Sequence, residues 1–244
     1  MAGVRVGTSG WSYPEWVGPF YPKPTPPARM LEYYAGRLRT VEAHSTHRRT
    51  PTEASLSRWV SQVPPDFRFA PKAHAGITHR RDLDGMPERM EAFFASLRPL
   101  DDRLGPTLFV LPHRQPDLHR LELLLSSLPA TGAGWPPPAV FELGPAWRTD
   151  EVLEMLAQHN ASLALIDRDP GQEGPEPAAV PAGPMTYVRL RRSRYTDDEL
   201  KAWAARLAAA AGTGDGDVYV FLKHDEHGDA PRYAQTLVEH LERA

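Results

Sequence analysis

The 244-residue sequence contains no cysteine. Disulfide bonds, thiolate zinc sites and a cysteine nucleophile are therefore excluded. No stretch approaches the ~18 consecutive apolar residues of a membrane helix, and the N-terminal segment lacks the apolar core of a signal peptide. Walker, dinucleotide-binding and Gly-x-Ser-x-Gly motifs are also missing. These absences predict a cytoplasmic protein without a membrane partner, and they leave any cofactor unknown.

The chain also has little net charge. Its 28 basic and 31 acidic side chains give a formal net charge of −3. This balance produces no overall basic field, so strong non-specific binding to nucleic acid or anionic lipid is disfavoured. A local groove for an oligonucleotide remains open. Hydrophobic residues make up 41% of the chain, which is enough for a sizeable core.

Short strand-like runs alternate with segments of helical periodicity along the whole chain. Strands separated by helices pair in parallel through right-handed crossovers, and about eight such units close a barrel. The sequence therefore predicts an α/β fold: a single TIM-type (β/α) barrel of roughly eight parallel strands with outer helices. The expected strands are Val4–Thr8, Thr40–His44, Phe67–Lys72, Thr107–Leu111, Ala139–Leu143, Leu163–Asp167, Tyr187–Leu190 and Val218–Lys223.

The helical segments carry start signals and leave no room for a second domain. Thr149 and Thr196 precede acidic residues and are expected to cap their helices. The only plausible linkers, Gly132–Pro138 and Gly171–Pro184, lie inside the strand–helix rhythm. We therefore expect one domain over residues 1–244. The expected helices are Ala28–Leu38, Pro87–Leu97, Asp117–Leu128, Thr149–His159, Thr196–Ala211 and Pro231–Leu241.

Functional residues of a β/α barrel come from the carboxyl ends of the strands and the loops that follow them. Alternation along each strand predicts which of these side chains face the interior. A polar mouth is expected on this basis. Its catalytic residues are predicted to be Glu42, Lys72 and Asp167, and its ligand-binding residues from the strand ends to be His44, Arg189, Arg191 and His224.

These charges admit two interpretations. Glu42 and Lys72 could form a mutually neutralising structural pair, whereas polar groups that converge on one mouth are typical of a ligand site, which we favour. A metal held by Glu42, His44 and Asp167 would be an optional addition. No metal site is predicted, because His-x-x-His pairs such as His44 with His47 are a weak pattern.

The stretch GTSGWSYPEW contains the end of the first expected strand and the loop after it. Backbone amides near Gly7 and Ser9 are placed to hold an anion, and the Ser9 hydroxyl has the chemistry of a nucleophile. Trp11 and Tyr13 lie close enough to the strand end to stack on a base or a sugar ring. Trp16, further along, is expected to plug one end of the barrel.

Several stretches together resemble one known family. GTSGWSYPEWVGPFYP, TVEAHST, FRFAPKAH and DVYVFLKHDEHGDAP occur in this order over nearly the whole chain. They are similar to the domain-of-unknown-function 72 family, also called YecE-like. The resemblance implies a TIM barrel and no established reaction. It carries over mouth positions Gly7, Thr8, Ser9, Gly10, Trp11, Tyr13, Glu42, Ser45, Thr46, Lys72, Asp167 and Arg189.

The fifth expected strand departs from the family pattern. Where the family typically reads VEFRHPSW, this chain reads VFELGPAW. This register predicts that Phe141 and Leu143 face the barrel interior and that Glu142 faces the helices, unless a bulge shifts the strand. Polar groups of the site would then have been replaced by apolar ones.

Three classes of function remain open. The first is an enzyme acting on a phosphate-bearing or nucleotide-like substrate, in which Lys72, Arg189 and Arg191 neutralise the anion and Glu42 or Asp167 is the acid or base. The main anion contacts are expected from Lys72 and Arg189. The second is a non-catalytic binder of a small molecule or oligonucleotide, and the third a barrel that serves a protein partner. Glycosidase chemistry needs two facing carboxylates and is weakened by the fifth-strand register.

Overall fold

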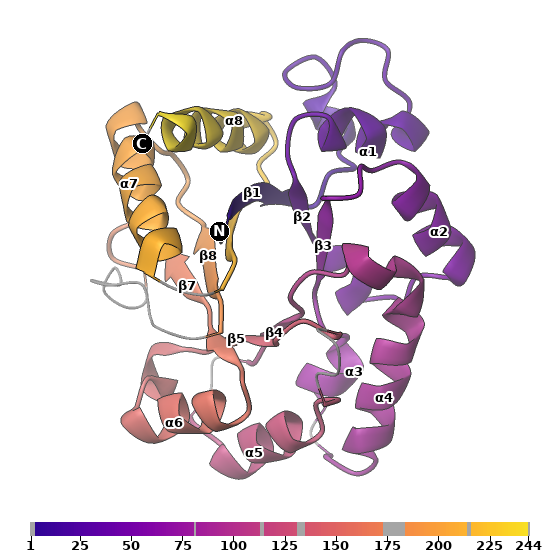
Figure 1. Ribbon diagram of the computed structural model, residues 1–244, viewed down its shortest axis with the longest axis vertical. Helices are drawn as coiled ribbons and strands as arrows, with labels where there is room; N and C mark the ends of the chain where they lie inside the picture. The colour runs from indigo at the N-terminus through magenta and orange to yellow at the C-terminus, as the bar shows by residue number, and fades with distance from the viewer. Residues whose placement is uncertain are drawn as a thin grey trace.

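Parallel strands occupy the centre of the molecule and helices surround them (Figure 1). The structure is a computed structural model that describes residues 3–80, 82–112, 115–130, 135–172, 184–213 and 216–243. Of the candidate linkers, Gly171–Pro184 lies largely outside these residues, and Gly132–Pro138 lies outside them at positions 132–134. Among the residues described, no helix combines the length and the apolar character that a membrane crossing requires. The arrangement is an α/β fold consistent with a TIM-type barrel.

Two parallel sheets form the centre. The first has the strand order β3-β2-β1-β9-β8-β7 and the second the order β4-β5-β6, and every pairing within them is parallel. The strands are β1 (Val4–Ser9), β2 (Thr40–Ala43), β3 (Arg68–Pro71), β4 (Leu108–Val110), β5 (Val140–Glu142), β6 (Ser162–Leu163), β7 (Leu165–Asp167), β8 (Thr186–Leu190) and β9 (Val218–Leu222).

The expected single closed sheet of about eight strands is therefore divided in the part of the chain that the structure describes. Only Ala164 separates β6 from β7, so one extended segment contributes to both sheets. On the other side, isolated bridges join Phe69 to Leu104 and Lys72 to Leu108. Pro71, at the end of β3, has no amide hydrogen to donate, which limits the ladder between β3 and β4.

The six expected helices are present with shifted ends, and two others were missed. The helices are α1 (Pro27–Ala35), α2 (Glu53–Ser61), α3 (Ala75–Thr78), α4 (Met86–Leu97), α5 (Leu118–Ser126), α6 (Asp150–Gln158), α7 (Asp197–Thr213) and α8 (Asp229–Glu242). The predicted caps are confirmed: Thr149 Oγ1 accepts from the amide of Val152, and Thr196 Oγ1 from that of Glu199. The missed α2 has the same signal, because Thr52 Oγ1 accepts from the amide of Ser55.

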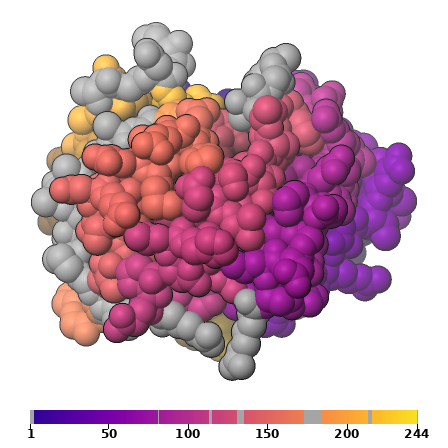
Figure 2. Space-filling view, turned by 90° about the horizontal axis from the view of Figure 1, so that it is seen from below, coloured from indigo at the N-terminus to yellow at the C-terminus, as the bar shows by residue number. Residues whose placement is uncertain are grey.

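Apolar side chains form an outer and an inner cluster on the two faces of the strands. The outer cluster lies between the strands and the helices. Figure 2 shows that the helices α4, α5 and α6 form a continuous cover on the face seen there. The inner cluster gathers residues from both sheets, including Leu108, Val140, Tyr187, Tyr219 and Phe221. The interior is therefore packed with apolar side chains from both sheets. The buried charged side chains Glu42, Glu142 and Arg189 lie toward the carboxyl ends of their strands.

Asp167 belongs to the outer layer, which corrects its expected place in the mouth. In the strand register it lies beside Leu190, and Leu190 lies beside Leu222; both leucines pack against the helices. The Asp167 carboxylate is fully buried. It accepts hydrogen bonds from Arg192 Nε (2.7 Å), Tyr195 Oη (3.0 Å) and Trp203 Nε1 (3.1 Å). Asp167 thus fastens α7, through Trp203, to the end of β7.

We predict that Asp167→Ala lowers the free energy of unfolding by about 3–5 kcal/mol, because it leaves buried donors and the Arg192 charge without their acceptor. Chemical denaturation followed by circular dichroism measures this change. The matched control is Asp169→Ala. The hydrogen bonds that the Asp169 carboxylate accepts from Ser193 are solvent-exposed, so this substitution should cost about 1 kcal/mol or less. Equal losses in the two variants would contradict the anchoring role of Asp167.

Candidate functional site

Glu42 lies at the centre of a buried polar cluster at the carboxyl end of the six-stranded sheet. Its side chain is fully buried. Ser9 Oγ donates to Glu42 Oε1 over 3.1 Å, and Arg189 Nη2 donates to the same oxygen over 2.6 Å. Tyr187 Oη donates to Oε2 over 3.0 Å. Strand geometry explains this set, because Ser9 pairs with Glu42 across β1 and β2, and Tyr187 and Arg189 are two residues apart on β8.

Glu142 joins the same cluster, so the predicted orientation of the fifth strand is wrong. Its carboxylate accepts a hydrogen bond from Arg189 Nη1 and lies 3.5 Å from Arg168 Nη2. The neighbouring Phe141 faces the helices instead, where its ring stacks on Phe109 at a centroid distance of 5.0 Å. The arrangement satisfies both residues: the phenyl ring enters the outer core, and the buried carboxylate meets a guanidinium.

Arg189 therefore binds one carboxylate from each sheet. We call Glu42, Glu142 and Arg189 the carboxylate–guanidinium cluster. Burial by itself would raise the pKa of Glu42, but Arg189 and Arg191, with the hydrogen bonds that Glu42 accepts, hold this pKa below its ordinary value. Glu42 is thus ionised at neutral pH. Arg189 uses both terminal nitrogens, and its buried Nε has no hydrogen-bond partner among the described residues.

Two further cations, Lys72 and Arg191, face this cluster. Within the described residues, neither the Lys72 amine nor the Arg191 guanidinium makes a hydrogen bond or an ion pair, although both are partly buried. The structural ion pair considered for Glu42 and Lys72 does not form, because Glu42 is paired with Arg189 instead. Burial lowers the pKa of Lys72, and Arg189 lowers it further, against the opposite effect of the two glutamates.

The balance of charge at the mouth is therefore positive in the part of the chain that the structure describes. Four cationic side chains, Arg168, Arg189, Arg191 and Lys72, interact with two carboxylates, Glu42 and Glu142. A surplus of positive charge in a partly dry site attracts anions far more strongly than the same charge in bulk water. The local field is thus opposite in sign to the net charge of the chain.

Aromatic and imidazole rings form the rim above Ser9. The Tyr13 ring stacks on His224 at a centroid distance of 3.8 Å, and its hydroxyl donates to the Ser9 carbonyl over 2.7 Å. His224 Nε2 lies 2.9 Å from Glu15 Oε1, and His44 is exposed beside Tyr13. Gly10, at φ +85°, allows this close approach, because a Cβ there would lie 2.4 Å from Tyr13 Oη.

Other predicted residues lie elsewhere. Trp11 packs against Trp59 of α2, at a centroid distance of 4.9 Å, and on the helix side of Phe69, so it does not face the interior. Gly7 serves the contact between β1 and β2, since a Cβ there would lie 2.1 Å from the Thr40 carbonyl oxygen. Trp16 is fully buried in the outer cluster and donates to the Asp225 carbonyl.

The optional metal set is not assembled. Asp167 lies in the outer layer, away from Glu42 and His44. No group of three or more histidine, aspartate and glutamate side chains suited to a metal ion occurs among the residues that the structure covers. His47 is bound instead to the backbone, with Nδ1 2.8 Å from the Ala73 carbonyl oxygen.

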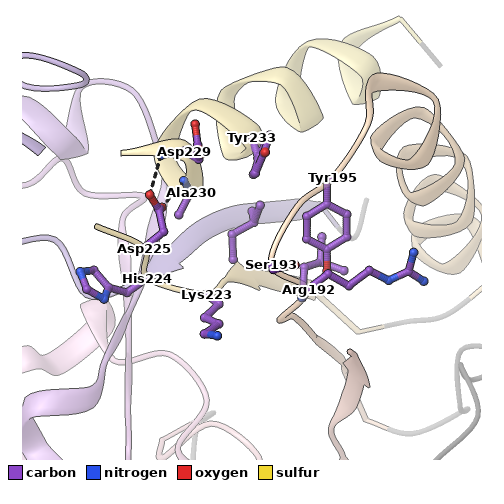
Figure 3. Close-up of a pocket in the computed structure, with 11 residues that line it drawn as sticks. Arg192, Ser193, Tyr195, Lys223, His224, Asp225, Asp229, Ala230 and Tyr233 are labelled. Atoms are coloured by element: carbon purple, nitrogen blue, oxygen red, sulfur yellow. Dashed lines mark hydrogen bonds between the residues drawn. The ribbon is translucent and has the colours of Figure 1, made fainter. Parts of the chain in front are cut away.

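A small hollow and a larger groove, both lined by described residues, adjoin the strand ends. The smaller, of about 50 Å³, lies between the ends of β8 and β9 and the start of α8 (Figure 3). Its Asp225 carboxylate accepts hydrogen bonds from the amides of Asp229 and Ala230, which starts α8, and the space admits little more than water. A groove of about 390 Å³ is lined by His79, Arg80, Arg120 and Trp147. Burial lowers the pKa of His79, and the nearby charge of Lys72 lowers it further.

Sequence reasoning missed Tyr187, Glu142 and Arg168. Tyr187 had an available signal, since it precedes Arg189 by two residues on one strand and shares its face. Glu142 and Arg168 had none, because the register of a three-residue strand is set by the packing of its neighbours.

Glu42→Gln should lower the free energy of unfolding at pH 7 by about 3–5 kcal/mol, because it leaves Arg189 partly unpaired. The lowered pKa of Glu42 means that the folded protein binds its proton less tightly than the unfolded chain does. Its stabilisation is therefore present above the ordinary glutamate range and lost as pH falls through and below it. Between pH 7 and pH 3, the free energy of unfolding should fall less in Glu42→Gln than in the exposed control Glu154→Gln. Parallel curves would refute the assignment.

Comparisons with known proteins agree with this fold and do not assign a reaction. The chain is 30% identical to the UPF0759 protein YecE of Escherichia coli (strain K12), over 98% of this chain and 93% of that relative. A crystal structure of a DUF72 family protein from Thermotoga maritima covers 98% of this chain and 99% of its own, with a TM-score of 0.84 and 25% identity. A DUF72 family protein from Enterococcus faecalis superimposes with a TM-score of 0.80 at 18% identity, over 98% of this chain and 95% of that one.

The family model described as protein of unknown function DUF72 matches residues 5–244. The stretches that suggested this resemblance, from the GTSGWSY opening to the last strand, all lie within or overlap the matched region. This chain belongs to the DUF72 family.

Proposed function

We propose that the two sheets act as a single β/α barrel and that its carboxyl-end mouth binds a small anionic ligand, a phosphate-bearing molecule in particular. One observation carries the proposal. Arg189 occupies both nearby carboxylates, so Lys72 and Arg191 face the site with no partner among the described side chains. Cations that are partly desolvated and unpaired are costly unless a ligand supplies the opposite charge.

The expected contacts change in one respect. Arg189 was predicted to bind the anion directly, but its terminal nitrogens are used by Glu42 and Glu142. Arg191 takes its place beside Lys72, and the role of Arg189 is to hold the acids away from them. An anion at ~4 Å from one such charge gains about 4 kcal/mol at an effective dielectric constant near 20, compared with about 1 kcal/mol in bulk water.

The geometry favours anion binding over carboxylate acid–base catalysis. A glycosidase needs one carboxyl group whose pKa is raised so that it can donate a proton. Glu42 has the opposite shift and accepts three hydrogen bonds, and Glu142 is held by the same guanidinium. Glu42 is therefore ionised and does not donate a proton at neutral pH, and the contact with Arg189 occupies Glu142.

The rim favours a compact ligand over a nucleotide. The Tyr13 ring already stacks on His224, and its centroid lies 4.6 Å from that of Trp16. Trp11 packs into the outer layer. With these rings engaged, a base has no free stacking platform among the predicted aromatics, whereas a phosphate needs only the cations.

We predict that inorganic phosphate binds the protein and that Lys72→Met and Arg191→Met each weaken binding by about ten- to a hundred-fold. This corresponds to the ~1.5–3 kcal/mol of a hydrogen bond to a charged group. Isothermal titration calorimetry at low ionic strength measures the affinity, because screening reduces it at high salt.

Arg58→Met is the matched control, since Arg58 is an exposed residue of α2. It removes one positive charge from the same protein and should leave the affinity unchanged. The mouth is not an anion site if the unaltered protein does not bind phosphate. It is also not an anion site if all three variants bind phosphate with the affinity of the unaltered protein.

A further inference from the structure

Lys72 differs in its surroundings from every other lysine of the chain. The sequence contains four lysines, and Lys23, Lys201 and Lys223 are exposed. Lys72 follows β3 at the mouth and is only partly accessible. Its amide lies 3.0 Å from Thr46 Oγ1 and its carbonyl accepts from the same hydroxyl over 2.7 Å, so the backbone is held on a rigid part of the fold.

The amine of Lys72 is surrounded by charges that do not pair with it. Glu42 and Glu142 would be its natural partners, but Arg189 binds both. Arg189 and Arg191 repel an ammonium ion, and partial burial removes part of its hydration. The same physical effects lower the pKa of Lys72, which increases the fraction of neutral amine at a given pH. A neutral, positioned lysine amine is a nucleophile towards carbonyl carbon.

We propose that Lys72 is a covalent nucleophile that condenses with the aldehyde or ketone group of an anionic ligand. The inference rests on the anion site proposed above, with Arg191 as the cation left free to hold the anionic group once Lys72 has reacted. The Nζ lone pair attacks the carbonyl carbon to form a C–N bond and a carbinolamine. Loss of the carbinolamine oxygen as water then gives an imine, and addition of water reverses the step. No oxidant or reductant is consumed.

Pyridoxal 5′-phosphate tests this inference, because it carries an aldehyde and a phosphate on one small ring. The protein is incubated with this probe and the imine is reduced with borohydride, which delivers hydride to the imine carbon and fixes a secondary amine. Peptide mass spectrometry then measures the label on each of the four lysines. We expect Lys72 to be labelled before the exposed lysines, and inorganic phosphate to slow its labelling.

Two lysine-to-arginine variants serve as a matched pair. Lys72→Arg keeps the positive charge but removes the nucleophile, so the fast-labelling phase should be lost. Lys223→Arg removes an exposed lysine from the end of β9 and should leave that phase unchanged. Labelling that follows exposure, with Lys72 slowest or unmodified in the unaltered protein, would overturn the inference without any variant.

The outcomes separate this inference from the anion site on which it rests. Calorimetric binding of phosphate together with no reduced adduct on Lys72 would leave the anion site standing and overturn the nucleophile. An adduct on Lys72 that forms equally fast with pyridoxal, which lacks the phosphate, and that phosphate does not slow would support the nucleophile and overturn the anion site.

Discussion

The double contact of Arg189 determines the character of the whole site. A single guanidinium on β8 binds Glu42 of β2 and Glu142 of β5, and so joins the six-stranded sheet to the three-stranded sheet across the interior. Buried ion pairs gain little net stability over apolar packing, but a half-paired buried charge is strongly unfavourable. The contact therefore fixes the relative position of the two sheets more than it adds to stability.

The same contact also decides which charges are available for binding. Because Arg189 satisfies both acids, Lys72 and Arg191 lie in a partly dry region and pair with no acid among the described residues. Their surplus of positive charge arises in a chain whose net charge is negative. The electrostatic character of a site thus follows from local pairing, and composition alone does not report it.

Much of the fold could be predicted from the sequence, because alternating strand and helix patterns and cap residues are local signals. Thr149 and Thr196 were recognisable in this way. The site was predicted less completely. Glu42, Lys72 and Arg189 were found by strand alternation. Asp167 was misplaced because it was assigned to the mouth as the end of its strand, although it shares the outer face of Leu163 and Leu165. Glu142 was misplaced because a family register was applied to a strand of three residues. Short strands carry too few residues for their pattern to fix which face is buried.

The inner apolar cluster limits how a ligand could reach the proposed site. Tyr187, Tyr219 and Phe221 fill the space beneath the polar residues, together with side chains from both sheets. Within the described residues, packed side chains therefore close the interior beneath the polar cluster. A ligand of the proposed anion site would enter and leave by the same opening, so a departing molecule and an arriving one would compete for it.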